Sequence, residues 1–148
     1  MAFNILVVDD SETMRAVIRK TVAMSGVQVG EFHEAGNGKE ALGILEDAWM
    51  DVVLTDINMP EMGGVEFLRE VKKNPVLRNI PVIFISTESS QTRMDEVVGL
   101  GAAAYVKKPF MPEKIKEVLL DVLTKAYATR MAAEGGASPP AAADEADF

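Results

Sequence analysis

The stretch Ile5-Leu6-Val7-Val8-Asp9-Asp10-Ser11 joins four consecutive apolar residues to two aspartates and a serine. A short, continuous apolar run bounded by turn-forming residues is typical of a strand that is buried on both faces of a sheet. Similar runs occur at Val52–Leu54 and Val82–Ile85, and weaker ones lie around Glu31–Ala35 and Ala104–Lys107. The sequence therefore predicts five short, buried strands.

Each of these runs is followed by a segment in which apolar residues recur at the spacing of one helix face. The five apolar stripes contain Met14, Val17, Ile18 and Val22; Ala41, Leu42 and Leu45; Val65, Leu68 and Val71; Met94, Val97 and Val98; and Ile115, Val118, Leu119, Val122 and Leu123. Buried strands that alternate with amphipathic helices predict an α/β fold whose parallel sheet is covered on both faces. We expect a single flavodoxin-like domain, with a five-stranded, doubly wound parallel sheet in the order 2-1-3-4-5.

The composition excludes several classes of function. The net charge of −8 argues against binding to nucleic acid or to an anionic membrane surface. The chain has no cysteine, which excludes disulfides, thiolate catalysis and Cys-ligated metals, and its single histidine excludes a site with several His ligands. No apolar stretch is long enough to cross a membrane, and the N-terminus does not resemble a signal peptide, so we expect a cytoplasmic protein.

The composition changes near Arg130. Residues 131–148 contain seven Ala, two Gly, two Pro and four acidic residues but no basic one, so this segment holds half of the net charge. Because the segment lacks apolar periodicity, it cannot offset the conformational entropy that it would lose on ordering. We therefore expect a folded domain over residues 1–130 and a disordered, acidic, Ala-rich tail over residues 131–148.

The predicted strands end in residues that carry chemistry. The first strand ends in Asp9 and Asp10, the third in Asp56, the fourth in Ser86 and the fifth in Lys108. In the order 2-1-3-4-5 these carboxyl ends are neighbours at the point where the strand order reverses. Crowded carboxylates repel one another, and an all-oxygen donor set favours Mg²⁺ or Ca²⁺ over zinc. We expect a Mg²⁺ site, with Lys108 and Ser86 placed to bind phosphate oxygens and an aspartate as the nucleophile.

Each of these residues, taken alone, has a simpler interpretation. Asp10 and Ser11 are both favoured helix caps, and an aspartate that follows a strand is usually a solvated turn residue. Lys107 and Lys108 together are most often only surface charge. The functional interpretation depends on the coincidence that every candidate falls at the functional edge of its own strand.

The chain resembles response-regulator receiver domains of the stand-alone, chemotaxis (CheY-like) type over about residues 3–127. The resemblance is carried by the segments Ile5–Ser11, Asp51–Pro60, Gly63-Gly64, Ile85–Glu88 and Tyr105–Phe110. Each segment alone is a weak signal, but five in this order and at the family's spacing are highly specific. The resemblance implies a phosphorylation-dependent signalling protein. Such a protein is an autocatalytic phosphoacceptor that dephosphorylates itself, and it is not a multi-turnover enzyme.

The resemblance also implies roles for residues at the strand ends. Asp56 is similar to the family's phosphoacceptor, and Asp10 and Asp56 are similar to its direct Mg²⁺ ligands. The backbone carbonyl of Asn58 would be a further ligand, and Asp9 would help to hold the metal. Lys108 resembles the lysine that binds the phosphoryl group, and the Lys108–Pro109 bond is expected to be cis.

A switch and an output surface are implied in the same way. Ser86 resembles the family's switch hydroxyl, and Tyr105 resembles the aromatic residue that turns inward when this hydroxyl moves. Thr87 stands where the family often has Ala. Asn58 and Glu88 lie at positions that flank the path of the hydrolytic water in receivers. The expected switch and output residues are Thr87, Glu88, Arg93, Met94, Tyr105 and Lys107, on the surface formed by the fourth helix, the fifth strand and the fifth helix.

The partners that the resemblance implies are all proteins. A sensor histidine kinase would donate the phosphoryl group, a downstream target would read the switched surface, and a phosphatase is a further candidate. The flagellar motor switch is one candidate target, although Gln91 and Val118 stand where motor-binding members tend to carry Lys. The alternative within the family is a phosphate sink or phosphorelay intermediate without a conformational reader.

Two other classes of protein share parts of this pattern. A Mg²⁺-dependent aspartyl-phosphate phosphatase would need Asp-x-Asp after the first strand, where this chain has Asp9-Asp10-Ser11. A flavin-binding module of the same topology would need a hydroxyl-rich phosphate loop there, and Asp9, Asp10 and Glu12 would repel a phosphate. Both classes therefore fit this sequence less well than a receiver domain does.

Overall fold

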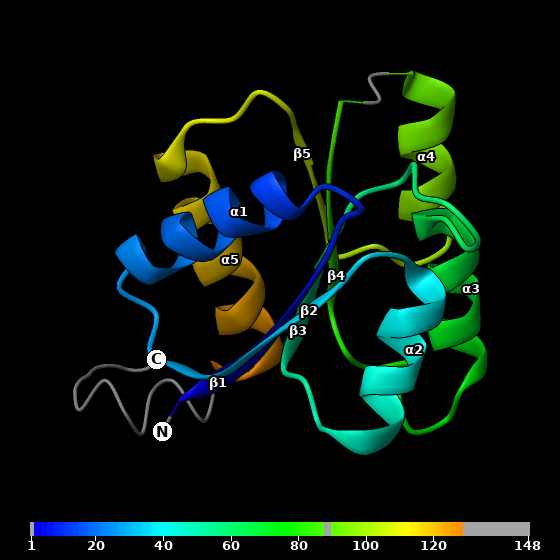
Figure 1. Cartoon of the computed structure of the whole chain (residues 1–148), viewed down its shortest axis with the longest axis horizontal. Coiled ribbons are helices and arrows are strands. Elements are labelled where there is room, and N and C mark those ends of the chain that lie inside the picture. Colours follow the sequence, from blue (N-terminus) through cyan, green and yellow to red (C-terminus); the bar gives the residue numbers. More distant parts are fainter. Residues whose placement is uncertain (1, 88–89, 129–148) are drawn as a thin grey trace.

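In the computed structural model of the chain, residues 2–87 and 90–128 are described. Strands and helices alternate through the whole of this part (Figure 1). The elements are β1 (Phe3–Val8), α1 (Glu12–Met24), β2 (Val29–Ala35), α2 (Gly38–Asp47), β3 (Val52–Thr55), α3 (Gly64–Lys73), β4 (Val82–Ser86), α4 (Gln91–Gly99), β5 (Ala104–Lys107) and α5 (Pro112–Ala126). The predicted succession of five strand–helix units is confirmed. β1 and β2 begin two residues before the apolar runs that predicted them, because Phe3 and Val29 already pair with each other.

The sheet is parallel and has the predicted order, β2-β1-β3-β4-β5. Val8 pairs with Ala35 on one side and with Thr55 on the other, so β1, β2 and β3 end at the same level. On the far side of the sheet, Ser86 at the end of β4 pairs with Lys107 at the end of β5. The fold is therefore the single flavodoxin-like α/β domain that the sequence predicts.

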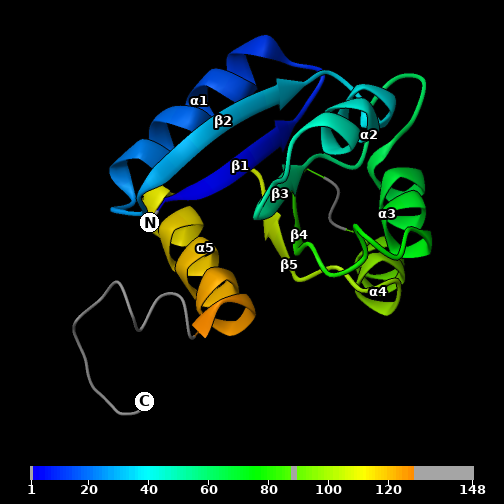
Figure 2. The same cartoon turned by 90° about the horizontal axis from the view of Figure 1, so that it is seen from below.

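Helices cover both faces of the sheet. Figure 1 shows α1 and α5 on one side and α2, α3 and α4 on the other, and Figure 2 shows the same two layers from below. Alternate strand residues supply the two cores: Ile5 and Val7 pack with α1 and α5, whereas Leu6 and Val8 pack with α2 and α3. Burial on both faces explains why the strands read as continuous apolar runs rather than as an alternation.

A polar network joins the amino ends of β1 and β3 to the end of α5. The Asp51 carboxylate, which is 3% exposed, accepts from the Asn4 backbone N–H at 2.7 Å and from Trp49 Nε1 at 3.2 Å. The Tyr127 hydroxyl donates to the Asp51 carbonyl at 2.9 Å, and its ring packs against Phe3. These bonds anchor the chain just after α5, so the folded domain extends to Tyr127 or beyond.

Two further expectations concern the backbone and the membrane. The Lys108–Pro109 peptide bond is cis, as the resemblance implies. In the described part of the chain, every helix is too short or too polar to span a lipid bilayer. The predicted tail, residues 131–148, lies outside the described residues, and so does Arg130, at which its boundary was placed.

Candidate phosphoacceptor and metal site

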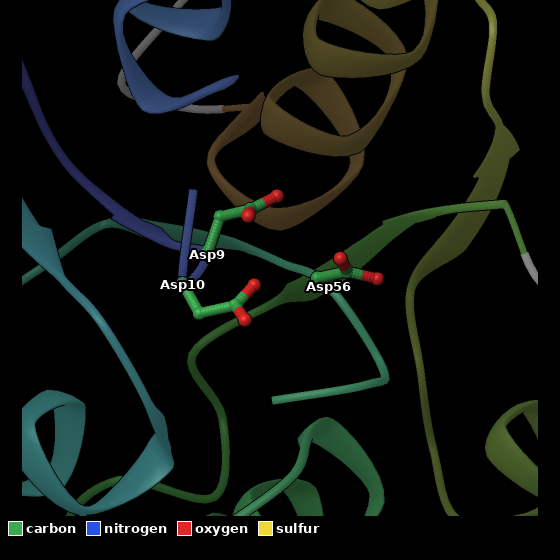
Figure 3. A group of neighbouring side chains, drawn as sticks. All are labelled: Asp9, Asp10 and Asp56. Carbon is green, nitrogen blue, oxygen red and sulfur yellow. The ribbon is translucent and has the colours of Figure 1, made fainter. Parts of the chain in front are cut away.

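Three aspartates meet at the carboxyl edge of the sheet. Asp9 and Asp10 follow β1 and Asp56 follows β3, and one carboxylate oxygen from each lies within 4.8 Å of the other two (Figure 3). The backbone N–H of Asp56 donates to the Val8 carbonyl at 2.9 Å, which holds the two strand ends side by side. Asp9 is buried, Asp56 is partly buried and Asp10 is exposed, so the cluster opens to solvent at Asp10.

Asp9 is held by donors on both carboxylate oxygens. Its Oδ1 accepts from the Ser11 backbone N–H at 2.8 Å, and its Oδ2 accepts from Lys108 Nζ at 2.9 Å. Ser11 is also the N-cap of α1, and its hydroxyl accepts from the Met14 N–H at 3.1 Å. The helix-cap interpretation of Ser11 is therefore correct. Capping does not compete with the cluster, because it leaves the Asp9 and Asp10 side chains at the site.

The Asp56 carboxylate is oriented by one backbone N–H, which the motif alone did not reveal, and by Lys108. Its Oδ1 accepts from the Ile57 N–H at 2.7 Å, and its Oδ2 accepts from Lys108 Nζ at 3.2 Å. The start of α3 packs closely against the backbone of Asp56. A Cβ built on Gly64 would clash with the Asp56 carbonyl and the Phe84 ring. The structure therefore explains why the second residue of the Gly63-Gly64 motif, which begins α3, has to be glycine.

Lys108, which directly follows β5, forms ion pairs with both Asp9 and Asp56. Its side chain is 11% exposed, and its ammonium lies between Asp9 and Asp56. Burial on its own lowers the pKa of Lys108. The hydrogen bond to Asp9 and the charges of Asp56 and Asp9 outweigh burial, and the pKa is raised above its usual value of 10.5. The site therefore keeps a fixed positive charge at neutral pH, beside the carboxylate that would accept a phosphoryl group.

Lys108→Ala is expected to lower the free energy of unfolding by about 2 kcal/mol in metal-free buffer at neutral pH, because two largely buried carboxylates each lose one of their two donors and their paired positive charge. Since the pKa of Lys108 is raised in the folded state, this contribution is complete below the ordinary lysine pKa and disappears as the pH rises through the folded value. Urea unfolding with a chelator, at pH 7 and above pH 11, measures both effects. Lys107→Ala, at the exposed neighbour, serves as the control. Equal stabilities for the Lys108 variant and the wild type at pH 7 would contradict this account.

The residues of the expected switch lie on two paired strands. Ser86 is fully buried at the end of β4, and its carbonyl accepts from the Lys108 N–H at 2.8 Å. Tyr105 is partly buried on β5, where its ring stacks on Phe84 with the ring centroids 6.3 Å apart. Thr87 is exposed beyond the end of β4. The structure thus places Ser86 and Tyr105 on neighbouring, paired strands, with Ser86 bonded to the backbone of Lys108.

The remaining predicted output residues lie on α4 and β5. Arg93 and Met94 are partly exposed on α4, and Lys107 is exposed at the end of β5. Arg93 Nη1 donates to Glu96 at 2.8 Å, so its side chain is held along its own helix. Glu88 lies outside the described residues, and Asn58 is exposed in the loop after β3.

The donor set at this edge fits a divalent cation. The cluster offers three carboxylates, no imidazole and no thiolate, and a hard cation such as Mg²⁺ prefers oxygen ligands of this kind. The exposed Asp10 side leaves room for the water molecules that Mg²⁺ usually retains. Asp9, Asp10 and Asp56 are therefore the side chains that could hold Mg²⁺.

Comparison with known proteins identifies the family. The family model for the response regulator receiver domain matches residues 5–120, which is most of the chain. The chain therefore belongs to the response-regulator receiver domains. Receiver domains of this kind are phosphoacceptors in two-component signalling rather than multi-turnover enzymes, and they typically bind Mg²⁺ at an acidic pocket.

Curated relatives and solved structures agree with this assignment. The chain is 38% identical over 121 residues to a chemotaxis protein CheY homolog of Campylobacter jejuni, an alignment that covers 81% of this chain and 92% of the relative. It is also 38% identical to chemotaxis protein CheY1 of Helicobacter pylori, with 81% and 96% covered. The structure of the chemotaxis response regulator CheY4 of Vibrio cholerae matches with a TM-score of 0.75 at 33% identity, covering 83% of this chain and all of that one.

Proposed function

We propose that this chain is a phosphorylation-dependent single-domain response regulator in chemotaxis-like two-component signalling, with Asp56 as its phosphoacceptor. The observation that carries the proposal is that Asp56 lies beside two other carboxylates and is paired with the Lys108 ammonium. An isolated surface aspartate has no such surroundings. The likeness to chemotaxis proteins over most of their length supports the signalling context.

The proposed chemistry is one phosphoryl transfer followed by one hydrolysis. A carboxylate oxygen of Asp56 attacks phosphorus, the P–N bond to the histidine of a kinase breaks, and the leaving imidazole takes up a proton. Lys108 pairs with the phosphoryl oxygens, and the N–H of Ile57 keeps Asp56 oriented. Water later cleaves the acyl phosphate, which restores the Asp56 carboxylate and releases inorganic phosphate.

Asp9, Asp10 and Asp56 would hold Mg²⁺ together with the backbone carbonyl of Asn58. When bound, this cation neutralises negative charge on the phosphoryl oxygens. Asp9 already has donors on both oxygens, so its role is to help hold the site, whereas Asp10 faces solvent. Asn58 follows Asp56 by two residues and lies in the exposed loop, next to the path proposed for the hydrolytic water.

We further propose that phosphorylation acts on the output surface through Ser86 and Tyr105. A phosphoryl group on Asp56 would attract the Ser86 hydroxyl by a charge-assisted hydrogen bond, and the Tyr105 ring would fill the vacated space. This shifts the equilibrium of the segment between β4 and α4, to which Thr87 and Glu88 belong. The changed surface would include Arg93, Met94 and Lys107.

The proposed partners follow from this mechanism. A sensor histidine kinase supplies the phosphoryl group, a protein such as the flagellar motor switch reads the surface, and a phosphatase is a further candidate. The alternative is a phosphate sink or phosphorelay intermediate, which has the same chemistry without a reader. Nucleic acid and membrane lipid are not expected to bind at a net charge of −8, and we propose a cytoplasmic location.

Beryllofluoride, a phosphoryl mimic, separates the two alternatives. In amide NMR spectra with Mg²⁺, a switching regulator should show changes at Tyr105 and along α4 as well as around Asp56. Asp56→Asn serves as the control that should not respond. Changes confined to the immediate surroundings of Asp56 would favour the sink or relay intermediate and contradict the proposed switch.

We propose that the folded domain ends by Arg130 and that residues 131–148 form a tail without a role in the chemistry. Ending the chain after Arg130 is expected to leave the melting temperature, the Mg²⁺ affinity and the phosphorylation rate unchanged. Ending it after Ala126 should lower the melting temperature by a few degrees, because it removes the contacts of Tyr127 with Phe3 and Asp51. A phosphorylation rate altered several-fold by the first truncation would show that the boundary is wrong.

A further inference from the structure

We infer that Arg15 is a positioning residue for the cation site, acting on Asp10 through the peptide group that joins Asp9 to Asp10. The inference rests on the proposed function, because it takes the acidic cluster to be the Mg²⁺ site. Arg15 is not itself a ligand. It lies near the start of α1, where the sequence gives no sign of a functional role.

The Arg15 guanidinium connects three elements of the fold. Its Nη1 donates to the backbone carbonyl of Asp9 at 2.6 Å, and its Nε donates to Glu34 Oε1 at 2.9 Å. The Arg15 side chain is only 15% exposed, and its bond to Asp9 is partly shielded from water. One side chain on α1 thus fixes the end of β1 and is in turn fixed by β2.

The hydrogen bond from Arg15 to the Asp9 carbonyl lies at the end of the hydrogen-bond ladder between β1 and β2. The Asp9 N–H still donates to the Ala35 carbonyl at 3.0 Å, as in a regular parallel pair. The next bond of a regular parallel ladder would run from the Asn37 N–H to the Asp9 carbonyl, but Asn37 is already the N-cap of α2, and the described part of the chain has no such bond. The Arg15 guanidinium therefore supplies the donor to the Asp9 carbonyl that a backbone N–H would supply in a continued ladder.

This carbonyl controls the direction of Asp10. A peptide group is planar, so the oxygen of Asp9 lies in one plane with the nitrogen and Cα of Asp10. A donor that holds the oxygen therefore limits rotation of that plane and restricts the positions open to the Asp10 side chain. In the part of the chain that the structure describes, the Asp10 carboxylate accepts no hydrogen bond, unlike that of Asp9. Its position depends on the backbone.

Arg19 provides a matched comparison. It also pairs with Glu34, with Nη1 3.4 Å from Oε2, but its side chain is 60% exposed and it lies over the Phe32 ring, 4.8 Å from the centroid. It contacts the same carboxylate as Arg15 without contacting Asp9. Arg15→Met and Arg19→Met therefore make the same change of charge and residue type, and only the first removes the bond to the Asp9 carbonyl.

The sign of the effect separates positioning from simple electrostatics. Removing a positive charge near a cation site should strengthen Mg²⁺ binding if only Coulomb attraction matters. Removing a donor that orients a metal ligand should weaken Mg²⁺ binding. Loss of a residue that hydrogen-bonds to a metal ligand typically lowers metal affinity by about 10-fold to 100-fold. Arg15→Lys keeps the charge but loses the planar fork that reaches Asp9 and Glu34 together.

The test is calorimetric titration of the full chain with Mg²⁺ alone, without a phosphodonor. Arg15→Met is expected to bind Mg²⁺ about tenfold more weakly, the lower end of that range. Arg15→Lys should fall between Arg15→Met and the wild type, and Arg19→Met should stay close to the wild type. Thermal melting in the presence of a chelator shows whether each variant is folded. If Arg15→Met does not fold, Arg15→Lys still tests the inference.

The outcomes distinguish this inference from the proposed function. Suppose that the wild type binds Mg²⁺ and that Asp10→Ala loses this binding. If folded Arg15→Met or Arg15→Lys then binds Mg²⁺ as tightly as the wild type or more tightly, Arg15 does not position the site. In that case the inference fails and the proposed function stands. An equal loss for Arg15→Met and Arg19→Met would overturn the inference as well. If the wild type binds no Mg²⁺, the proposed function and the inference fail together.

Discussion

Asp56→Asn is expected to abolish phosphorylation of this protein by acetyl phosphate in the presence of Mg²⁺. The amide has nearly the shape of the carboxylate but lacks the anionic oxygen that would attack phosphorus. Asp56 is partly buried, with its oxygens 2.7 Å from the Ile57 N–H and 3.2 Å from Lys108 Nζ, so the variant keeps a similar environment. Incorporation of one phosphoryl group per chain can be followed by intact mass or by radiolabel.

A matched control makes this result specific. Asp47→Asn makes the same chemical change at an exposed residue in the last turn of α2, and it should be phosphorylated like the wild type. Retained labelling in Asp56→Asn would mean that another residue accepts the phosphoryl group. The roles proposed for Lys108 and Ser86 around Asp56 would then also have to be abandoned.

Asp10→Ala is expected to weaken Mg²⁺ binding by more than about tenfold, because it removes one of the three carboxylates that meet at the site. Phosphorylation by acetyl phosphate should fall with it and should no longer respond to Mg²⁺. Asp10 is exposed, so the fold should tolerate the change. Calorimetric titration measures the affinity, and the phosphorylation rate at several Mg²⁺ concentrations measures the dependence.

Glu12→Ala is the control for this variant. Glu12 begins α1 two residues later and is 94% exposed, so its removal changes the charge nearby without altering the cluster. It should bind Mg²⁺ nearly as the wild type does. If Asp10→Ala and Glu12→Ala lowered the Mg²⁺ affinity by the same small amount, loss of ordinary surface charge would explain both changes. The three aspartates would then not be a cation site.

The sequence predicted the fold because the chain repeats one simple pattern. Buried strands alternating with amphipathic helices leave few arrangements, and the observed order β2-β1-β3-β4-β5 is the one expected. The same argument brought Asp9, Asp10, Asp56 and Lys108 to one edge, because the carboxyl ends of parallel strands must meet there. The structure confirms that they meet, whereas their chemical roles stay predictions.

The contacts that orient these residues could not be predicted from the sequence. The bridge from Arg15 to Asp9 and Glu34 joins residues from three elements, and strand periodicity does not specify which long side chain reaches which oxygen. The same is true of the Asp51 network at the opposite edge of the sheet. Sequence patterns indicate which face or end of an element a residue occupies, but these bonds depend on side-chain conformations that form only when the elements pack.

Locating the phosphoryl group in the wild-type protein tests the central claim most directly. The protein is treated with acetyl phosphate and Mg²⁺, the acyl phosphate is reduced with borohydride, and peptides are sequenced by mass spectrometry to find the aspartate converted to homoserine. We predict conversion at Asp56, and its loss when Mg²⁺ is chelated beforehand. Conversion at Asp9, Asp10 or any other aspartate in place of Asp56, or no conversion at all, would contradict this account.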